Sequence, residues 1–351
     1  MEIQKFLEIV LAYQASDLHL LVGRPPIVRL EGRLLPIANT EVLTEDQCKM
    51  MIFSLMEPSQ KELLMTNKEL DFSFSFGAKG RFRVNAYFEK GQLAAALRMI
   101  PLKIKTIEEL NLPNVCHRFA RLERGFILVT GPTGHGKSST LAAIIEEINQ
   151  TREEHIITIE DPIEYLYVSK RSIISQREMH QDSHSWEIAL RSALREDPDV
   201  VLVGEMRDYE TIAAALTIAE TGHLVFATLH TNSASQTIDR IVDVFPENQQ
   251  AQIRIQLANT LEAVLSQRLL PAIGGGRVPA TEILLSVPAV RTNIREGKSY
   301  MIDNIIQTSA EIGMMPLEVS LANWVNKGRL TLEEARSWSL RPEELSRMVK
   351  S

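Results

Sequence analysis

Hydrophobic and polar positions follow two periodicities in the first hundred residues of the chain, one typical of a helix and one typical of strands. Apolar residues recur at the spacing of one helix face from Ile3 to Leu11. Strict alternation then predicts strands over 71–76 and 81–88, and a third strand is expected over 93–100. Residues 1–100 are therefore expected to form a small α/β domain around an antiparallel sheet.

The pattern changes after a linker with short helices that is expected over 101–124. Short apolar runs, Phe126–Val129, Ile156–Ile159 and Val200–Val203, predict buried strands. Loops and helical segments separate these strands, which favours a mostly parallel sheet. This α/β core is expected to span 125–287.

The end of this core and the C-terminal region are predicted from breaks in the apolar pattern. The stretch from Asp239 to Leu270 is predicted to be helical with a break at Pro246. A last strand is expected over 280–287, and residues 288–351 are expected to be helical.

Composition narrows the class of protein. The chain has 351 residues, which suggests about two domains. Its net charge of −7 argues against sequence-independent binding of nucleic acid, because such binding needs a basic surface. Its two cysteines, Cys48 and Cys116, exclude a Cys₄ zinc site. No apolar run approaches the roughly 20 residues of a membrane span, so a cytoplasmic protein without membrane insertion is expected.

The strongest chemical signal follows the first strand of the core. A glycine-rich turn and then a helical apolar pattern give the strand, loop and helix order of a P-loop. Lys137 is expected to reach the β- and γ-phosphates of ATP, and the Ser138 hydroxyl to bind Mg²⁺. The predicted nucleotide-binding residues here are Gly131, Pro132, Thr133, Gly134, His135, Gly136, Lys137, Ser138 and Ser139.

Acidic and imidazole groups follow three later strands. Glu160, Asp161 and Glu164 come after one of them, and these carboxylates can serve Mg²⁺ or a water molecule. Glu205 follows the strand ending at Val203, where a water-orienting acid belongs, although Gly204 holds the usual aspartate position. His230 ends a further strand and is a candidate to sense the γ-phosphate.

Two arginines in the N-terminal domain form a second candidate site. If Glu89–Gln92 is a hairpin loop, Arg83 lies directly opposite Arg98. Like charges in that position repel each other, and a bound phosphate would relieve the conflict. The alternative is two solvated arginines that lean apart.

The motifs together resemble the secretion-ATPase superfamily and, within it, the retraction ATPases of type IV pili. The resemblance covers nearly the whole chain. The matching segments are Ala15–Leu20, Arg81–Asn85, the P-loop, Thr158–Glu164, Ala193–Asp199, Gly204–Asp208 and Gly222–Thr231.

The resemblance implies a PAS-like N-terminal domain over 1–100 and a RecA-like ATPase core over 125–287, followed by C-terminal helices. It also implies a homohexamer with ATP between the two domains and the N-domain arginines closing over it. Glu205 would be the catalytic glutamate, assisted by Glu164 and His230. The ring would lie in the cytoplasm at the inner membrane, and ATP turnover would let it pull on a pilus platform protein. Paralogous pilus ATPases are further candidate partners.

The subfamily follows from two features. Assembly and secretion ATPases usually carry a Cys₄ zinc insertion that this chain cannot form. Residues 289–297 resemble the C-terminal helix motif of retraction ATPases, with departures at Val290, Thr292 and Asn293, and His135 stands where the P-loop usually has a small residue. Three alternatives stay open: an assembly or type II secretion ATPase, a non-hydrolysing ATP-binding regulatory subunit, and a nucleic-acid translocase.

Overall fold

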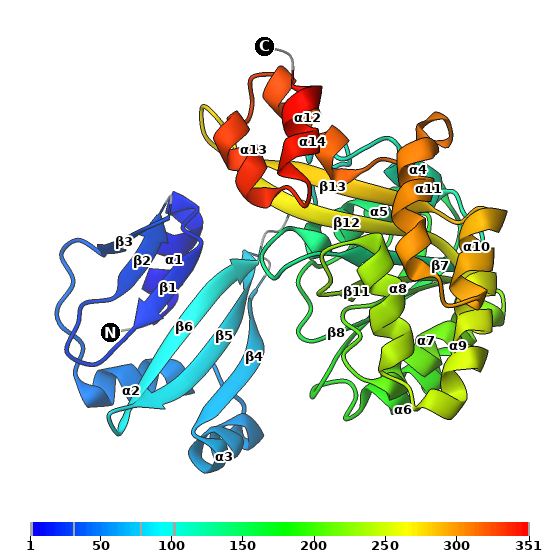
Figure 1. The fold of residues 1–351 in the computed structure, drawn as a ribbon. Helices are drawn as coiled ribbons and strands as arrows, with labels where there is room; N and C mark the ends of the chain where they lie inside the picture. Colours follow the sequence, from blue (N-terminus) through cyan, green and yellow to red (C-terminus); the bar gives the residue numbers. More distant parts are fainter. Residues whose placement is uncertain (1–2, 31, 78, 101–102, 350–351) are drawn as a thin grey trace. The chain divides into compact units, whose positions relative to one another are not determined.

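The computed structural model describes residues 3–30, 32–77, 79–100 and 103–349 and divides the chain into two compact units. One unit comprises Met1–Lys103 together with Pro162–Leu166, and the other comprises Ile104–Asp161 and Tyr167–Ser351 (Figure 1). Of the expected linker, residues 101 and 102 lie outside the described residues. Ile107 and Phe119 are buried in the core of the second unit, so this later part of the expected linker packs as part of that unit.

The N-terminal unit is a six-stranded antiparallel sheet in the order β3-β2-β1-β6-β5-β4. Its core consists of apolar side chains from the alternating strands and from the helices. Its elements are α1 (Ile3–Tyr13), β1 (Asp17–Leu20), β2 (Ile27–Leu30), β3 (Arg33–Pro36), α2 (Glu45–Phe53), α3 (Pro58–Asn67), β4 (Glu69–Phe76), β5 (Gly80–Glu89) and β6 (Gln92–Ile100).

Local signals explain several of these elements. The Thr44 hydroxyl accepts from the Gln47 N–H at the start of α2, and the Gln47 side chain accepts from the Thr44 N–H, which makes a capping box. The β5–β6 hairpin turns at Lys90 and Gly91, both with positive φ. This turn pairs Arg83 with Arg98, so the register predicted from the sequence is confirmed.

The second unit contains a seven-stranded sheet in the order β13-β12-β7-β11-β10-β8-β9. All neighbouring strands are parallel except β12 and β13, which are antiparallel. Up to the last strand, the elements are α4 (Val115–Ala120), β7 (Gly125–Thr130), α5 (Lys137–Thr151), β8 (His155–Glu160), β9 (Ile173–Glu178), α6 (Trp186–Ala193), β10 (Val200–Val203), α7 (Tyr209–Glu220), β11 (Leu224–Leu229), α8 (Ala234–Asp243), α9 (Glu247–Thr260), β12 (Leu261–Pro271) and β13 (Arg277–Leu285).

The prediction of helices as far as Leu270 is wrong after Thr260. Residues 261–271 form strand β12, which lies between β7 and β13. The strand is buried on both faces over most of its length, so its apolar residues do not alternate with polar ones. A pattern without alternation does not distinguish a central strand from a buried helix.

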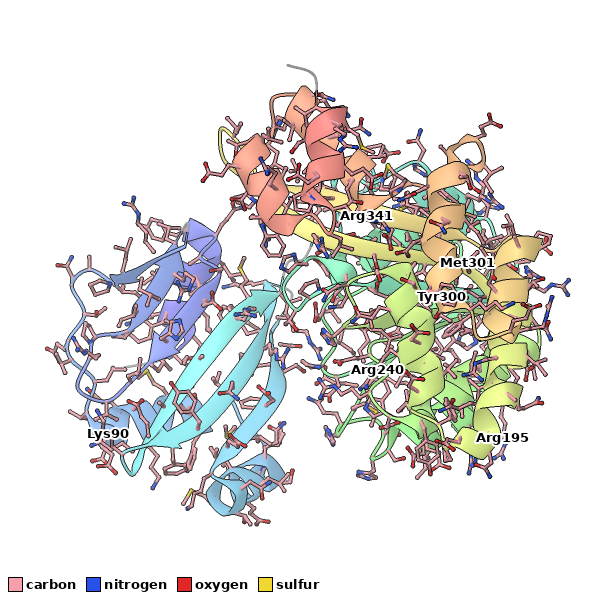
Figure 2. The ribbon with its side chains drawn as sticks, in the orientation of Figure 1. Lys90, Arg195, Arg240, Tyr300, Met301 and Arg341 are labelled. Carbon is pink, nitrogen blue, oxygen red and sulfur yellow. The ribbon has the colours of Figure 1, made fainter. Side chains whose placement is uncertain are left out.

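The helical prediction for the C-terminal region is confirmed for the described residues. The helices are α10 (Pro288–Arg295), α11 (Ile302–Thr308), α12 (Leu317–Asn326), α13 (Leu332–Trp338) and α14 (Pro342–Met348), with short 3₁₀ turns at Ser299–Met301 and Ala310–Ile312. Figure 1 shows α12, α13 and α14 gathered at one end of β12 and β13. Arg341, labelled in Figure 2, forms an ion pair with Asp303 of α11 at 3.0 Å. No helix in the described part of the chain has the length and apolar character to cross a membrane.

Candidate active site

The P-loop begins where β7 ends, at the carboxyl edge of the parallel strands. Gly131 has φ +140°, and a Cβ atom there would lie 2.1 Å from the carbonyl oxygen of Gln267 in β12. Only glycine allows this close approach, so the start of the loop is packed directly on the neighbouring strand. The loop ends at Gly136, which precedes the first turn of α5.

Lys137 is the first residue of α5 and is buried. Its Nζ donates to the carbonyl oxygens of Gly131 at 2.8 Å and Pro132 at 3.1 Å. The ammonium group therefore lies over the loop, next to the N–H groups of a helix N-terminus. A Cβ atom at Gly134 would meet no heavy atom within 4 Å, so open space faces this part of the loop. A lysine, a helix N-terminus and an open glycine face fit a phosphate group.

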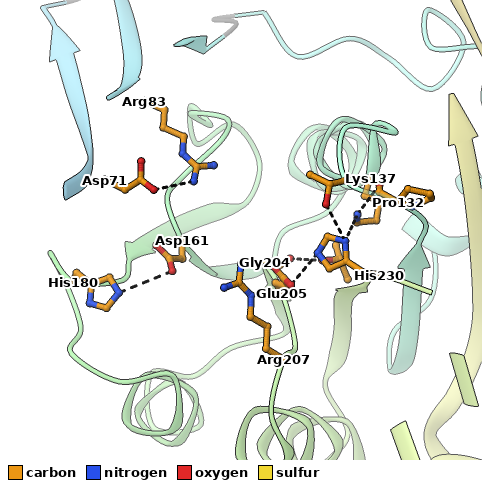
Figure 3. Close-up of polar contacts among 12 residues, drawn as sticks. Asp71, Arg83, Pro132, Lys137, Asp161, His180, Gly204, Glu205, Arg207 and His230 are labelled. Carbon is orange, nitrogen blue, oxygen red and sulfur yellow. Dashed lines mark hydrogen bonds and ion pairs between the residues drawn. The ribbon is translucent and has the colours of Figure 1, made fainter. Parts of the chain in front are cut away.

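His230 joins the P-loop to Glu205 (Figure 3). Its Nδ1 lies 3.3 Å from Lys137 Nζ and 3.3 Å from the Thr133 hydroxyl. Because an ammonium group can only donate, Nδ1 is the acceptor and the ring hydrogen lies on Nε2. His230 Nε2 donates to Glu205 Oε1 at 2.9 Å. Three residues predicted separately from the sequence, Lys137, Glu205 and His230, thus form one hydrogen-bonded chain.

Arg207 completes the surroundings of Glu205 and was not predicted as a site residue. Its guanidinium donates to Glu205 Oε2 at 2.8 Å. Burial raises the pKa of Glu205, but the hydrogen bonds from Arg207 and His230 and the charge of Arg207 outweigh it and leave this pKa below its ordinary value. The bond to Glu205 in turn raises the pKa of Arg207. Glu205 is therefore a carboxylate at neutral pH.

The position of the acid after Gly204 has a steric cause. A Cβ atom at Gly204 would lie 3.2 Å from the Glu160 Cα and 3.2 Å from the Ile159 carbonyl oxygen on the neighbouring strand β8. On the other side lies strand β11, where the Thr228 hydroxyl donates to the Gly204 carbonyl oxygen at 2.6 Å. Residue 204 is thus enclosed by two strands, and the first residue after β10 with room for a carboxylate is Glu205.

The acids predicted to serve Mg²⁺ have different surroundings. Glu160 is buried, and its carboxylate accepts hydrogen bonds from Thr158 at 2.7 Å and Gln176 at 3.4 Å. Asp161 is exposed and lies 4.0 Å from His180 Nε2. Glu164 is exposed and belongs to the segment Pro162–Leu166 that groups with the N-terminal unit. Their roles remain predictions.

No group of three or more His, Cys, Asp or Glu side chains within the described ranges could hold a metal ion by itself. In a P-loop, one hydroxyl holds Mg²⁺ together with the phosphates of the nucleotide. Ser138 is half-buried in the first turn of α5, next to Lys137. Its hydroxyl and position fit that role.

Arg83 and Arg98 lie opposite each other in the N-terminal unit, and each has a carboxylate partner. Arg83 is 3.5 Å from Asp71 on β4, and Arg98 Nε donates to Asp17 on β1 at 3.0 Å. Burial raises the pKa of Asp17, but hydrogen bonds from Ser16 and Arg98 and the Arg98 charge outweigh it and lower this pKa overall. The repulsion expected between the arginines is therefore relieved by acids on the two flanking strands.

Both arginines still have capacity for an anion. The Arg83 side chain is 39% exposed and the Arg98 side chain 71% exposed. Each guanidinium has five N–H groups, more than one carboxylate can use. Their assignment to nucleotide binding remains a prediction.

Comparisons with known proteins give a consistent result. A family model described as type II/IV secretion system protein matches residues 2–275. The chain is 48% identical over 343 residues to the type IV pilus retraction ATPase PilT of Pseudomonas aeruginosa, covering 98% of this chain and 99% of the relative. It is also 48% identical over 322 residues to a twitching motility protein of Neisseria gonorrhoeae, covering 92% and 86%. A crystal structure of the pilus retraction motor PilT with bound ADP matches with a TM-score of 0.92 and 46% identity, covering 99% of both chains.

Proposed function

The chain belongs to the family of type II/IV secretion system proteins, and we propose that it is an ATP-hydrolysing motor that powers the retraction of type IV pili. The near full-length similarity to retraction ATPases is the observation that carries this proposal. The hydrogen-bonded chain from Lys137 through His230 to Glu205 supports the enzymatic part.

Nucleotide binding depends on the P-loop. Lys137 exchanges its bonds to the Gly131 and Pro132 carbonyls for phosphate oxygens, which accept stronger, charge-assisted bonds. The backbone N–H groups of residues 131–139 and the N-terminus of α5 bind the remaining oxygens. Arg83 and Arg98 are proposed to contribute further guanidinium contacts to phosphate.

Ser138 is proposed to hold Mg²⁺, with Glu160 and Asp161 contributing partly through water. Bound there, Mg²⁺ would neutralise charge on the transferred phosphoryl group. The hydroxyl of Ser138 and the two acids supply the oxygen ligands that this ion prefers.

Glu205 is proposed to orient and activate the attacking water. Each of its oxygens holds one hydrogen bond, to His230 or to Arg207, and a carboxylate oxygen can accept a second. His230 keeps the carboxylate in place and contacts Lys137 on its other side, so it can respond to the terminal phosphate. Glu164 is proposed to assist.

Retraction also needs an assembly and a membrane anchor. A homohexamer is the proposed working form, cytoplasmic and bound at the inner membrane through the pilus platform protein. Paralogous pilus ATPases are further proposed partners. Turnover in the ring would pull on the platform protein and depolymerise pilin.

An assembly or secretion motor is the first alternative, and a regulatory subunit without turnover is the second. The chain has two cysteines and cannot build the Cys₄ zinc insertion of the first. Lys137 and Glu205 are both present and are joined by hydrogen bonds through His230, which argues against a regulatory subunit without turnover.

Overexpression in the host cell separates these functions. Retraction predicts fewer surface pili by electron microscopy, and the matched Glu205→Gln chain at equal expression should not reduce them. More surface pili would indicate an assembly motor. Equal loss of pili with both chains would exclude an effect that depends on turnover.

A further inference from the structure

Strand β12 extends beyond the end of its neighbour β7. The two strands pair as far as Thr130 and Ser266, and β12 continues to Pro271. Beyond Thr130 the chain leaves the sheet as the P-loop. The later residues of β12 therefore have the P-loop beside them in place of a strand.

His135 and Gln267 make the contacts that a strand would otherwise make. The Leu269 N–H donates to His135 Nδ1 at 2.9 Å. On its other side, Leu269 is paired with Pro279, which has no N–H. The Gln267 side chain donates to the His135 carbonyl oxygen at 2.8 Å and accepts from Thr140 at 2.7 Å. The P-loop and the first turn of α5 are thus both held by β12.

The His135 ring also contacts the C-terminal helices. Its centroid lies 5.2 Å from the ring centroid of Trp338, the last residue of α13, at an interplanar angle of 60°. The Trp338 indole N–H donates to Glu334 at 3.0 Å, which fixes the orientation of the ring. A serine or glycine at position 135 could make neither the ring contact nor the bond to Leu269.

Arg268 links the same helix to the loop that follows His230. Its guanidinium donates to the Trp338 carbonyl oxygen and, at 3.5 Å, to the Asn232 carbonyl oxygen. Burial and the charges of Lys137, Arg268 and Arg277 lower the pKa of His135. The ring is therefore neutral at pH 7, as the acceptor role of Nδ1 requires.

We propose that His135 is a positioning residue that couples the P-loop to α13, so that the docking of the C-terminal helices sets the affinity for nucleotide. The inference rests on the proposed function, because it assumes that the P-loop binds nucleotide. A loop held in its binding geometry from two sides loses less conformational freedom when it binds. Release of either contact should weaken binding.

The first experiment measures the dissociation constant of ADP for the full-length chain and two variants at position 135. His135→Ser should raise the constant about fivefold to a hundredfold, the range expected for one hydrogen bond and one ring contact. His135→Asn should recover part of this loss, because its Oδ1 can accept from the Leu269 N–H. Equal affinity of wild type and His135→Ser would overturn the inference, as would equal weakening by both variants.

The second experiment is a double-mutant cycle between positions 135 and 338. Trp338→Leu should weaken ADP binding, and it should have no further effect in the His135→Ser background. Trp324→Leu is the matched control, since Trp324 belongs to the same C-terminal cluster and donates to the Pro279 carbonyl oxygen. Its effect should be the same in both backgrounds. Additive effects of His135→Ser and Trp338→Leu would overturn the coupling.

Two controls keep these outcomes distinct. Circular dichroism and thermal unfolding identify any variant that does not fold, and the comparison of His135→Ser with His135→Asn does not depend on Trp338→Leu. Failure of the wild-type chain to bind ADP would contradict the proposed function itself. Normal binding by the wild type with unchanged binding by His135→Ser would contradict only the inference.

Discussion

Glu205 is the residue on which the proposed chemistry depends. Its side chain is held by His230 at one oxygen and by Arg207 at the other. The low pKa that results from these contacts keeps it ionised, as a residue that orients water must be. The contact between His230 and Lys137 joins this carboxylate to the P-loop.

Glu205→Gln should reduce ATP turnover at least tenfold, because an amide cannot accept a proton from water, while nucleotide affinity should change little. Single-turnover kinetics and equilibrium binding of a fluorescent ATP analogue measure the two quantities. Arg207→Lys serves as a control that keeps a positive charge beside the carboxylate. Equal turnover by wild type and Glu205→Gln would remove Glu205 from the mechanism.

Arg83→Ala tests the predicted phosphate contact in the N-terminal unit. Loss of a charge-assisted bond to phosphate should lower turnover of the full-length protein by roughly tenfold. Nucleotide binding by the isolated second unit, if it folds alone, should be unaffected, since that unit does not contain Arg83. Asp71→Asn is the matched control, because it weakens the ion pair without removing the guanidinium. Unchanged turnover of Arg83→Ala would leave this arginine with a structural role only.

Among the secondary-structure elements, strand β12 shows most clearly where prediction from the sequence fails. Strand alternation and the position of a hairpin loop are local signals, and they correctly predict the β5–β6 register. The helix predicted over 261–270 is wrong because burial on both faces removes the alternation of a strand. The polar residues Gln267 and Arg268 within that apolar run are a signal of a site.

The motifs predict which residues carry chemistry but not which of them meet. The P-loop, Glu205 and His230 were all identified from the sequence. The bonds between them, and those from Gln267 to the P-loop and α5, join positions far apart in the chain, and the ring contact of His135 with Trp338 spans 203 residues. Such contacts depend on the order of strands in the sheet, which no local pattern specifies.

Gly131→Ala should destabilise the sheet far more than Gly134→Ala. Both glycines have positive φ, but only the first would place a Cβ against main-chain atoms, 2.1 Å from the Gln267 carbonyl oxygen. The expected loss is about 3 kcal/mol or more for Gly131→Ala and about 1 kcal/mol for Gly134→Ala. Thermal unfolding without nucleotide measures the difference. Equal melting temperatures would contradict the close packing of the P-loop on β12.

Glu282 of β13 should make stability depend on pH. It is 8% exposed, and burial raises its pKa from 4.5 to about 7, although the Ala234 N–H at the start of α8 donates to it at 2.7 Å. The folded chain therefore binds this proton more tightly than the unfolded chain. The stabilisation is complete below pH 4.5 and is lost as the pH rises through about 7.

The loss should be on the order of 3 kcal/mol between pH 4.5 and 8. Glu282→Gln cannot titrate, so its melting temperature relative to wild type should rise over this range. Parallel curves for the two proteins would show that Glu282 does not titrate as inferred.

For the whole molecule, charge and family membership lead to the same class of protein. A net charge of −7 disfavours a nucleic-acid translocase, so added DNA should not stimulate turnover. Membership in the type II/IV secretion system family and near full-length similarity to pilus retraction ATPases supply the motor function. The site geometry supplies the residues through which such a motor would use ATP.

The decisive experiment on the proposed motor is its steady-state ATPase rate. The purified full-length chain is measured with and without Mg²⁺ and over a range of protein concentrations. We expect Mg²⁺-dependent turnover whose rate per chain rises with concentration as the proposed ring assembles, and no turnover by Lys137→Ala. Tight ATP binding without turnover at any concentration would contradict this expectation and would favour a regulatory subunit.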